Sequence, residues 1–301
     1  MEKLVIIKIS NGDWESGFSV TLQMFEGGSW KYQETGFLPG APDIPRYYQE
    51  WQSAYCDLPS PLRLEGKDDQ QVKNSSDRIN ECYNAANTFS RTFNKWLNSP
   101  KFHLLKEKLL VTLNKEDRIR AIFQTESLEL RRLPWHLWDF FDTYENAEVA
   151  IGNPNFKSPT KLNGYAAKNI VKILAILGDS KGIDVEADRN FLESLPNAEV
   201  VFKVEPNRKD ISKELWEQNW DILFFAGHSC TKGEEGLIYI NENQSLTLRE
   251  LRNGLKTAIK KSLKLAIFNS CDGLGLARQL EDLYIPQAIV MREPVPDAVA
   301  Q

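Results

Sequence analysis

The sequence predicts an α/β protein in which a mostly parallel sheet flanked by helices follows a smaller N-terminal α+β region. After Arg118, short apolar segments alternate with amphipathic ones, which is the pattern of a parallel sheet covered by helices on both faces. Before that point, apolar and polar residues alternate between glycine- and asparagine-bearing turns, which indicates a small antiparallel sheet. A chain of 301 residues is long enough for two hydrophobic cores. We therefore expect two domains, residues 1–105 and residues 106–301.

The N-terminal region begins with a predicted β-meander over residues 3–38, formed by "KLVIIKIS", "FSVTLQMF" and "WKYQETGFL". One helix is expected at residues 44–55 and a second at residues 79–97, where apolar residues recur at helical spacing. We expect Cys56 and Cys82 in the core. The region carries no catalytic constellation, so we expect it to dock onto the larger domain or onto another protein, in a supporting or regulatory role.

In the larger domain, the sequence predicts strands and helices that alternate and are joined by turns. Its predicted strands are "RIRAIFQTE", "VKILAILGD", "AEVVFKVE", "WDILFFAG", "LKLAIFNSC" and "PQAIVMRE". Its predicted helices are "EADRNFLESL", "ISKELWEQ", "TLRELRNGLKTAIKK" and "LGLARQLEDL". Parallel sheets of this kind bind ligands at the carboxyl ends of their strands. Three of these ends carry polar, glycine-bearing loops: "GDSKG" from Gly178, "GHSC" from Gly227 and "NSCDGLG" from Asn269.

Two of these strand ends carry residues that could form a nucleophilic site, His228 and Cys271. If their strands are neighbours, an imidazole and a thiol face one cleft, and the imidazole can accept the thiol proton to give a nucleophilic thiolate. The backbone amide of Cys271, at the start of a helix, and that of Ser229 could stabilise an oxyanion. These residues predict a Cys-His acyl-transfer site.

The segments "FFAGHS", "LAIFNSCDGLGLA" and "LRRLPWHLW" resemble the CHAT domains of bacteria, members of the caspase-like clan, and most closely those of cyanobacterial CHAT-containing proteins. The resemblance runs from about Arg118 to the C-terminus. It implies a caspase-like fold with His228 as catalytic histidine and Cys271 as nucleophile, and "LPWHLW" as a structural hallmark without chemistry. It also implies a cysteine endopeptidase that acts on peptides or proteins and needs no metal or organic cofactor. The alternative is a catalytically silent interaction or signalling module.

The resembled domain continues with a helix and a strand beyond a segment like "REPVPDAVAQ". We therefore expect a separately supplied C-terminal segment, another protein partner or an oligomer to complete the domain. For substrate choice, Asp272, Glu234 and Glu235 place negative charge near the expected cleft, which favours a basic residue at P1. Acidic loop residues are also common on solvated surfaces, so both interpretations stay open.

Composition and cysteine usage exclude several classes of function. A net charge of −5 gives no general attraction for nucleic acid or anionic membranes. The N-terminus lacks a cleavage signal and no apolar run reaches membrane-spanning length, and the four cysteines are widely spaced, so we expect a cytoplasmic protein. A zinc site at His228, Cys230 and Cys271 lacks a fourth ligand. We expect Cys230 in a loop, His103 at the surface and His136 packed against apolar neighbours.

Overall fold

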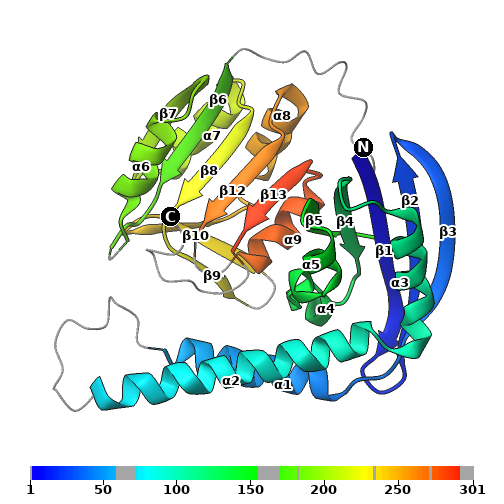
Figure 1. Cartoon of the computed structure of the whole chain (residues 1–301). Helices are drawn as coiled ribbons and strands as arrows, with labels where there is room; N and C mark the ends of the chain where they lie inside the picture. The colour runs from blue at the N-terminus through cyan, green and yellow to red at the C-terminus, as the bar shows by residue number, and fades with distance from the viewer. Residues whose placement is uncertain are drawn as a thin grey trace. The chain divides into compact units, whose positions relative to one another are not determined.

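The computed structural model describes residues 2–58, 72–154, 170–181, 183–232, 235–270 and 273–291. The chain forms two compact units, residues 1–156 (unit 1) and residues 157–301 (unit 2) (Figure 1). This division differs from the expected boundary after residue 105. Its cause is strand β4 (Arg118–Gln124), which pairs with the N-terminal strand instead of joining the sheet of unit 2.

Unit 1 is built on a sheet in which β1 (Glu2–Asp13) lies between β2 (Gly17–Glu26) and β4 (Figure 1). The pairs β1–β2 and β2–β3 are antiparallel, which confirms the predicted β-meander, and β3 spans Ser29–Leu38. Strand β4 runs parallel to β1 on one side and to β5 (Ala147–Gly152) on the other. The N-terminal meander and the start of the larger predicted domain therefore share one sheet.

The helices of unit 1 bury alternate residues of this sheet, among them Val5, Ile7 and Ile9 of β1. These helices are α1 (Asp43–Cys56), α2 (Val72–Leu97), α3 (Pro100–Thr112), α4 (Leu128–Arg132) and α5 (Phe140–Thr143). Helices α1 and α2 run side by side (Figure 1). Among the α2 side chains whose burial is described, those in the core cluster lie in its second half: Phe89, Phe93, Trp96 and Leu97. Ile79 and Tyr83, which share the helical apolar pattern, are exposed.

The "LPWHLW" segment supplies the centre of the unit 1 core. The Trp135 ring stacks on Phe123 at 4.3 Å, and its indole N–H donates to the carbonyl of Leu130 at 2.8 Å. Trp135 and Trp138 are both fully buried, which agrees with a structural role. His136, however, is exposed, as is Leu137 after it, while Trp135 and Trp138 of the same segment are buried; the expectation that His136 packs was wrong.

The other expected side-chain positions in unit 1 are partly confirmed. His103 is exposed, as predicted. Cys82 is half-buried on α2, where burial raises the pKa of its thiol. Cys56 is exposed instead of buried, because it is the last residue of α1 and lies beyond the part of that helix that reaches the core.

Unit 2 contains the predicted parallel sheet, in the order β13-β12-β8-β6-β7. Its strands are β6 (Val171–Leu177), β7 (Ala198–Val204), β8 (Ile222–Ala226), β12 (Leu265–Asn269) and β13 (Gln287–Val290). Its helices are α6 (Val185–Glu193), α7 (Arg208–Glu217), α8 (Arg252–Lys261) and α9 (Leu274–Asp282). Helix α6 shares a core with one face of the sheet, and α7, α8 and α9 share a core with the other. The α/β fold class is confirmed.

A small antiparallel sheet in unit 2 was not predicted. It consists of β9 (Ser229–Lys232), β10 (Glu235–Asn241) and β11 (Gln244–Thr247). Gly236, Ile238 and Ile240 of β10 are buried and alternate with half-buried residues. In the sequence this strand is a short apolar run from Leu237 to Ile240, which does not show that alternation. Cys230 consequently lies in a strand and not, as expected, in a loop.

Removal of residues 1–105 should make the remaining chain aggregate, because it would uncover the edge of β4 that pairs with β1 from Glu2–Arg118 to Lys8–Gln124. Size-exclusion chromatography of a fragment of residues 106–301 checks this. The control is a fragment of residues 157–301, whose sheet and cores lie within unit 2 and which should stay monodisperse. A monodisperse 106–301 fragment with a native circular dichroism spectrum would contradict the prediction.

In the part of the chain that the structure describes, no helix combines the length and apolar character needed to cross a membrane.

Candidate active site

The strands that lead to His228 and Cys271 are neighbours, as the sequence analysis required. Strands β8 and β12 are parallel, and Ala226 pairs with Asn269 in their register. His228 and Cys271 each follow their member of this pair by two positions. The two segments therefore leave the same end of the sheet from directly opposite positions. Cys271, Asp272 and Glu234 themselves lie outside the described residues.

His228 is held by main-chain groups on three sides. Its backbone N–H donates to the carbonyl of Asp179 at 3.2 Å, and its carbonyl accepts from the N–H of Tyr239 at 2.9 Å. Its side-chain Nε2 lies 2.9 Å from the carbonyl oxygen of Lys181. A carbonyl oxygen only accepts, so Nε2 carries the proton and Nδ1 of the neutral ring keeps a lone pair. The site thus presents a ring nitrogen that can take up a proton.

Gly178 and Gly227 lie in two loops beside His228 where neighbouring atoms come too close to leave room for a side chain. A Cβ at Gly178 would clash with the carbonyl oxygen of Tyr239 and lie 2.9 Å from Cε2 of Phe225. Gly227 has a φ of +148°, which side-chain-bearing residues rarely adopt, and its Cβ would lie 3.2 Å from Cα of Gly178. The N–H of Gly178 donates to the carbonyl of Ala226 at 2.8 Å. These contacts fix the His228 loop against the end of β6.

The Lys181 carbonyl is a site component that sequence reasoning missed. The sequence singled out "GDSKG" but offered no group to orient His228, since a search for an orienting residue considers side chains. The structure supplies a main-chain oxygen instead. Main-chain acceptors occur at every position, so no residue type marks this one.

The Cys271 side of the site is anchored at both flanks of the undescribed residues 271–272. Before them, Nδ2 of Asn269 donates to Oδ1 of Asp188 at 2.8 Å, and Asp188 is 7% exposed. After them, Gly273 is the N-cap residue of α9, and its N–H donates to the carbonyl of Met291 at 3.0 Å. A Cβ at Gly273 would lie 2.6 Å from Cβ of Val290. Asp188 was also missed as a site-supporting residue, because its segment was taken only as an amphipathic helix.

The β9–β10 hairpin starts directly after His228 and packs against α9, the helix that follows position 271. Gly236 of β10 lies so close to α9 that a Cβ there would be 2.5 Å from the N atom of Leu276. Ser229, whose amide was assigned to an oxyanion site, opens β9 opposite Ile238. Of the three acidic residues assigned to substrate binding, only Glu235 is described, and it pairs with Arg249 at 3.2 Å.

Cys230 contacts a tyrosine instead of a metal-binding group. Its Sγ lies 3.4 Å from Oη of Tyr239 on β10, and this hydrogen bond raises the pKa of Tyr239. No group of three or more His, Cys, Asp or Glu side chains is arranged to hold a metal ion within the described ranges.

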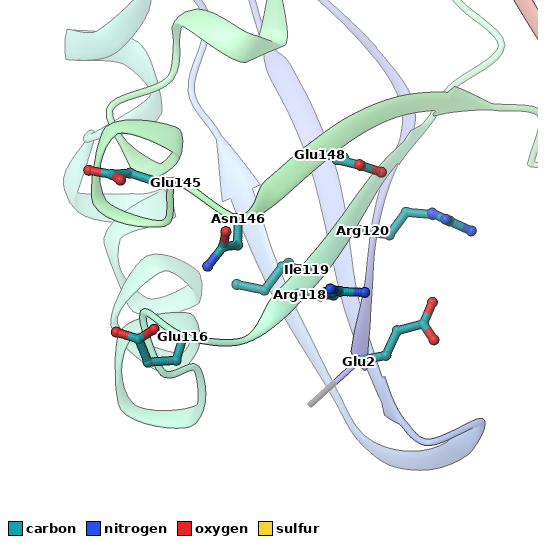
Figure 2. Close-up of a pocket in the computed structure, with 8 residues that line it drawn as sticks. All are labelled: Glu2, Glu116, Arg118, Ile119, Arg120, Glu145, Asn146 and Glu148. Carbon is teal, nitrogen blue, oxygen red and sulfur yellow. The ribbon is translucent and has the colours of Figure 1, made fainter. Parts of the chain in front are cut away.

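The cavity of about 730 Å³ shown in Figure 2 is lined by residues of unit 1. Arg118 and Arg120 project from β4, with Glu2 on β1 and Glu148 on β5 (Figure 2). The register pairs Glu2 with Arg118 and Arg120 with Glu148. Opposite charges at facing strand positions stabilise a sheet. Strand pairing therefore accounts for these charged side chains of the cavity lining.

Comparison with known proteins identifies the family. No curated protein matches the chain. A solved structure, described as a structural study of the Aquifex aeolicus PPX-GPPA enzyme, is 8% identical over 89% of this chain and 67% of its own, with a TM-score of 0.14, which is too low to bear on the fold. The model of the CHAT domain matches residues 118–301, more than half of the chain, and agrees with the resemblance found in the sequence. This chain therefore belongs to the CHAT domain family.

Proposed function

We propose that the protein is a caspase-like cysteine endopeptidase with Cys271 as nucleophile and His228 as general base. The observation that carries the proposal is the pairing of Ala226 with Asn269, which starts both segments from opposite positions at one end of the sheet. Family membership supports it, since CHAT domains are related to caspase-like peptidases. The substrate is a peptide or protein, and the chemistry needs no metal or organic cofactor. Cysteine nucleophiles act as reduced thiols, which fits the cytoplasm.

The reaction proceeds in two stages. Nδ1 of His228 accepts the thiol proton, and the Cys271 thiolate attacks the scissile carbonyl carbon, whose oxygen becomes an oxyanion held by the amides of Ser229 and Cys271. The imidazolium then protonates the leaving amine, the C–N bond breaks and a thioester forms. Water, deprotonated by His228, attacks the thioester, and the carboxylic acid product and the thiol are released. The Lys181 carbonyl keeps accepting from Nε2–H throughout.

Labelling by an electrophilic peptide probe tests this function. The wild-type chain should be labelled at Cys271, and Cys271→Ala should retain only background alkylation of its other thiols. His228→Ala should react about 10²- to 10⁴-fold more slowly, because general-base catalysis contributes that much. Peptide mass spectrometry locates the label. Cys56→Ala is the matched control, since Cys56 is an exposed thiol in unit 1 and its loss should change only background alkylation. Equal labelling of wild type and both site variants would refute the assignment.

The second candidate is a catalytically silent interaction module, which the same family could contain. In that case Cys271 would react no faster than Cys56, and His228→Ala would not alter the rate. The labelling experiment therefore separates the two functions directly.

Among substrates, we propose a preference for a basic residue at P1. Glu235 is partly neutralised by Arg249, so the preference rests mainly on Asp272 and Glu234. A positional-scanning peptide library should select Arg or Lys at P1. Selection of Asp at P1 would contradict this preference without affecting the assignment of the Cys-His pair.

A further inference from the structure

The loop after β6 is hydrogen-bonded to β8, to β10 and to His228 itself. The N–H of Gly178 donates to the carbonyl of Ala226 at 2.8 Å, on β8. The N–H of Asp179 donates to the carbonyl of Tyr239 at 2.9 Å, on β10. The carbonyl of Asp179 accepts from the N–H of His228 at 3.2 Å. Up to Asp179, then, the path of this loop is set by hydrogen bonds to its neighbours.

Beyond Asp179, the loop is closed by one main-chain hydrogen bond, in which the N–H of Ile183 donates to the carbonyl of Ser180 at 2.9 Å, and by one contact of the Asp179 side chain. Oδ1 of Asp179 lies 3.2 Å from the N–H of Lys181, and this contact closes an Asx turn, a local alternative to a main-chain turn. Lys181 is the residue whose carbonyl accepts from Nε2 of His228 at 2.9 Å. The amide of Lys181 is thus held by Asp179, and the carbonyl of Lys181 accepts from His228.

We propose that Asp179 is a positioning residue: its carboxylate fixes the turn that aims the Lys181 carbonyl at His228 and so holds the imidazole with its proton on Nε2. This role rests on the proposed function only insofar as His228 is the general base. The tautomer of the His228 ring can be measured whether or not Cys271 reacts. When the turn relaxes, the Lys181 carbonyl leaves its position, and the ring can rotate and exchange its proton between both nitrogens.

Two substitutions separate the geometry of the turn from the charge of Asp179. Asp179→Asn keeps an oxygen that can accept from the Lys181 N–H, and Asp179→Ala removes the acceptor. The matched control is Asp13→Ala in unit 1, because Oδ1 of Asp13 closes the same kind of turn by accepting from the N–H groups of Glu15 at 2.9 Å and Ser16 at 2.7 Å.

The first readout is the ¹⁵N NMR spectrum of the imidazole nitrogens in the full chain. With three histidines in the sequence, His228→Ala assigns the resonances of His228 by difference. Wild type, Asp179→Asn and Asp13→Ala should show one fixed Nε2–H tautomer, with the two nitrogens well separated. Asp179→Ala should show resonances averaged by exchange. The second readout is the rate of probe labelling at saturating probe, which Asp179→Ala should lower about three- to tenfold, as expected for one lost hydrogen bond, with half-saturation unchanged.

Wild-type tautomer and labelling rate in Asp179→Ala would overturn the proposal. Equal losses in Asp179→Asn and Asp179→Ala would also overturn it, because charge and not turn geometry would then be the cause. Should Asp179→Ala fail to fold, Asp179→Ser, whose shorter side chain also accepts, should show partial averaging. If wild type is not labelled at all, the proposed function fails, while the NMR comparison still decides the role of Asp179.

Discussion

Replacing Lys3 with Met should lower the free energy of unfolding of unit 1 by about 3–5 kcal/mol, the usual cost of removing one partner of a buried ion pair. Nζ of Lys3 lies 2.7 Å from Oδ2 of Asp117, and the two side chains are 6% and 7% exposed. Nζ also donates to the carbonyl of Thr112 at 2.9 Å. Without Lys3, the carboxylate stays buried and loses the ion pair with the Lys3 ammonium. Chemical denaturation followed by tryptophan fluorescence reports on unit 1, which holds six of the eight tryptophans.

The matched control for this substitution is Lys31→Met. Lys31 pairs with Glu26 at 2.8 Å, but its side chain is 47% exposed, so the loss should not exceed about 1 kcal/mol. The double variant Lys3→Met/Asp117→Leu should recover much of the lost stability, because the buried charge is removed with its partner. Equal effects of Lys3→Met and Lys31→Met would contradict the prediction.

The same pair predicts how the stability of unit 1 depends on pH. Burial alone would raise the pKa of Asp117, but hydrogen bonds from Lys3 and from the N–H of Asn114 outweigh it and lower the pKa below its usual 3.8. A carboxylate with a lowered folded-state pKa stabilises the fold above the unfolded-state value and loses this contribution as the pH falls through the folded-state value. Unit 1 should therefore lose stability below about pH 4. Lys3→Met should reduce this acid-dependent loss in denaturation curves measured across that range, because it removes the Lys3 hydrogen bond and leaves the one from Asn114.

Gly178→Ala should slow probe labelling of Cys271 by about 10²-fold, the effect expected when a catalytic group is misplaced by roughly 1 Å. The added Cβ would meet the Tyr239 carbonyl and the Phe225 ring, 2.9 Å away, so the loop must move. Its movement breaks the contacts that fix His228. Labelling kinetics and the unfolding of each unit measure the effect, which should destabilise unit 2 by about 1–3 kcal/mol and leave unit 1 unchanged.

Gly28→Ala is the control for Gly178→Ala. No atom lies within 4 Å of a Cβ at Gly28, although its φ of +78° makes the substitution cost about 1–2 kcal/mol in the turn between β2 and β3. Labelling should stay at the wild-type rate in this variant. A wild-type labelling rate in Gly178→Ala would show that the loop tolerates the added methyl group and that His228 does not depend on it.

Much of unit 2 could be predicted because its central strands are apolar runs. Such runs are typical of strands in a sheet that is covered on both faces. The placement of β4 could not be predicted from its strand pattern alone, because the pattern predicts a strand but not the strand with which it pairs. Its sequence nevertheless held a clue: in "RIRAIFQ", Arg118 and Arg120 are exposed while Ile119 and Ala121 are buried. That alternation is typical of a sheet with one covered face, and it matches the sheet of β1 better than that of β6, whose residues from Ile173 to Leu177 are all buried.

The candidate site was predictable where side chains carry it and unpredictable where the main chain does. His228 and Cys271 stand out as residue types at strand ends, whereas the Lys181 carbonyl has no distinguishing residue type. Asp188 falls between these cases. It occupies the apolar stripe of α6 with Val185 and Leu192, and a carboxylate on such a stripe marks a buried polar contact. That contact proved to be Asn269.

The parallel pairing of β1 with β4 also sets the order in which unit 1 can fold during synthesis. Glu2 pairs with Arg118, so the first strand waits for a partner 116 positions further along the chain. At ribosomal rates of about 5–20 residues per second, this delay is on the order of 10 s. The β1–β2–β3 meander is local and can form early, but one edge of β1 stays unpaired for that time. The nascent chain is therefore most exposed to wrong strand pairing before β4 emerges, which makes this interval the one in which chaperone protection would matter most for the yield of the protein.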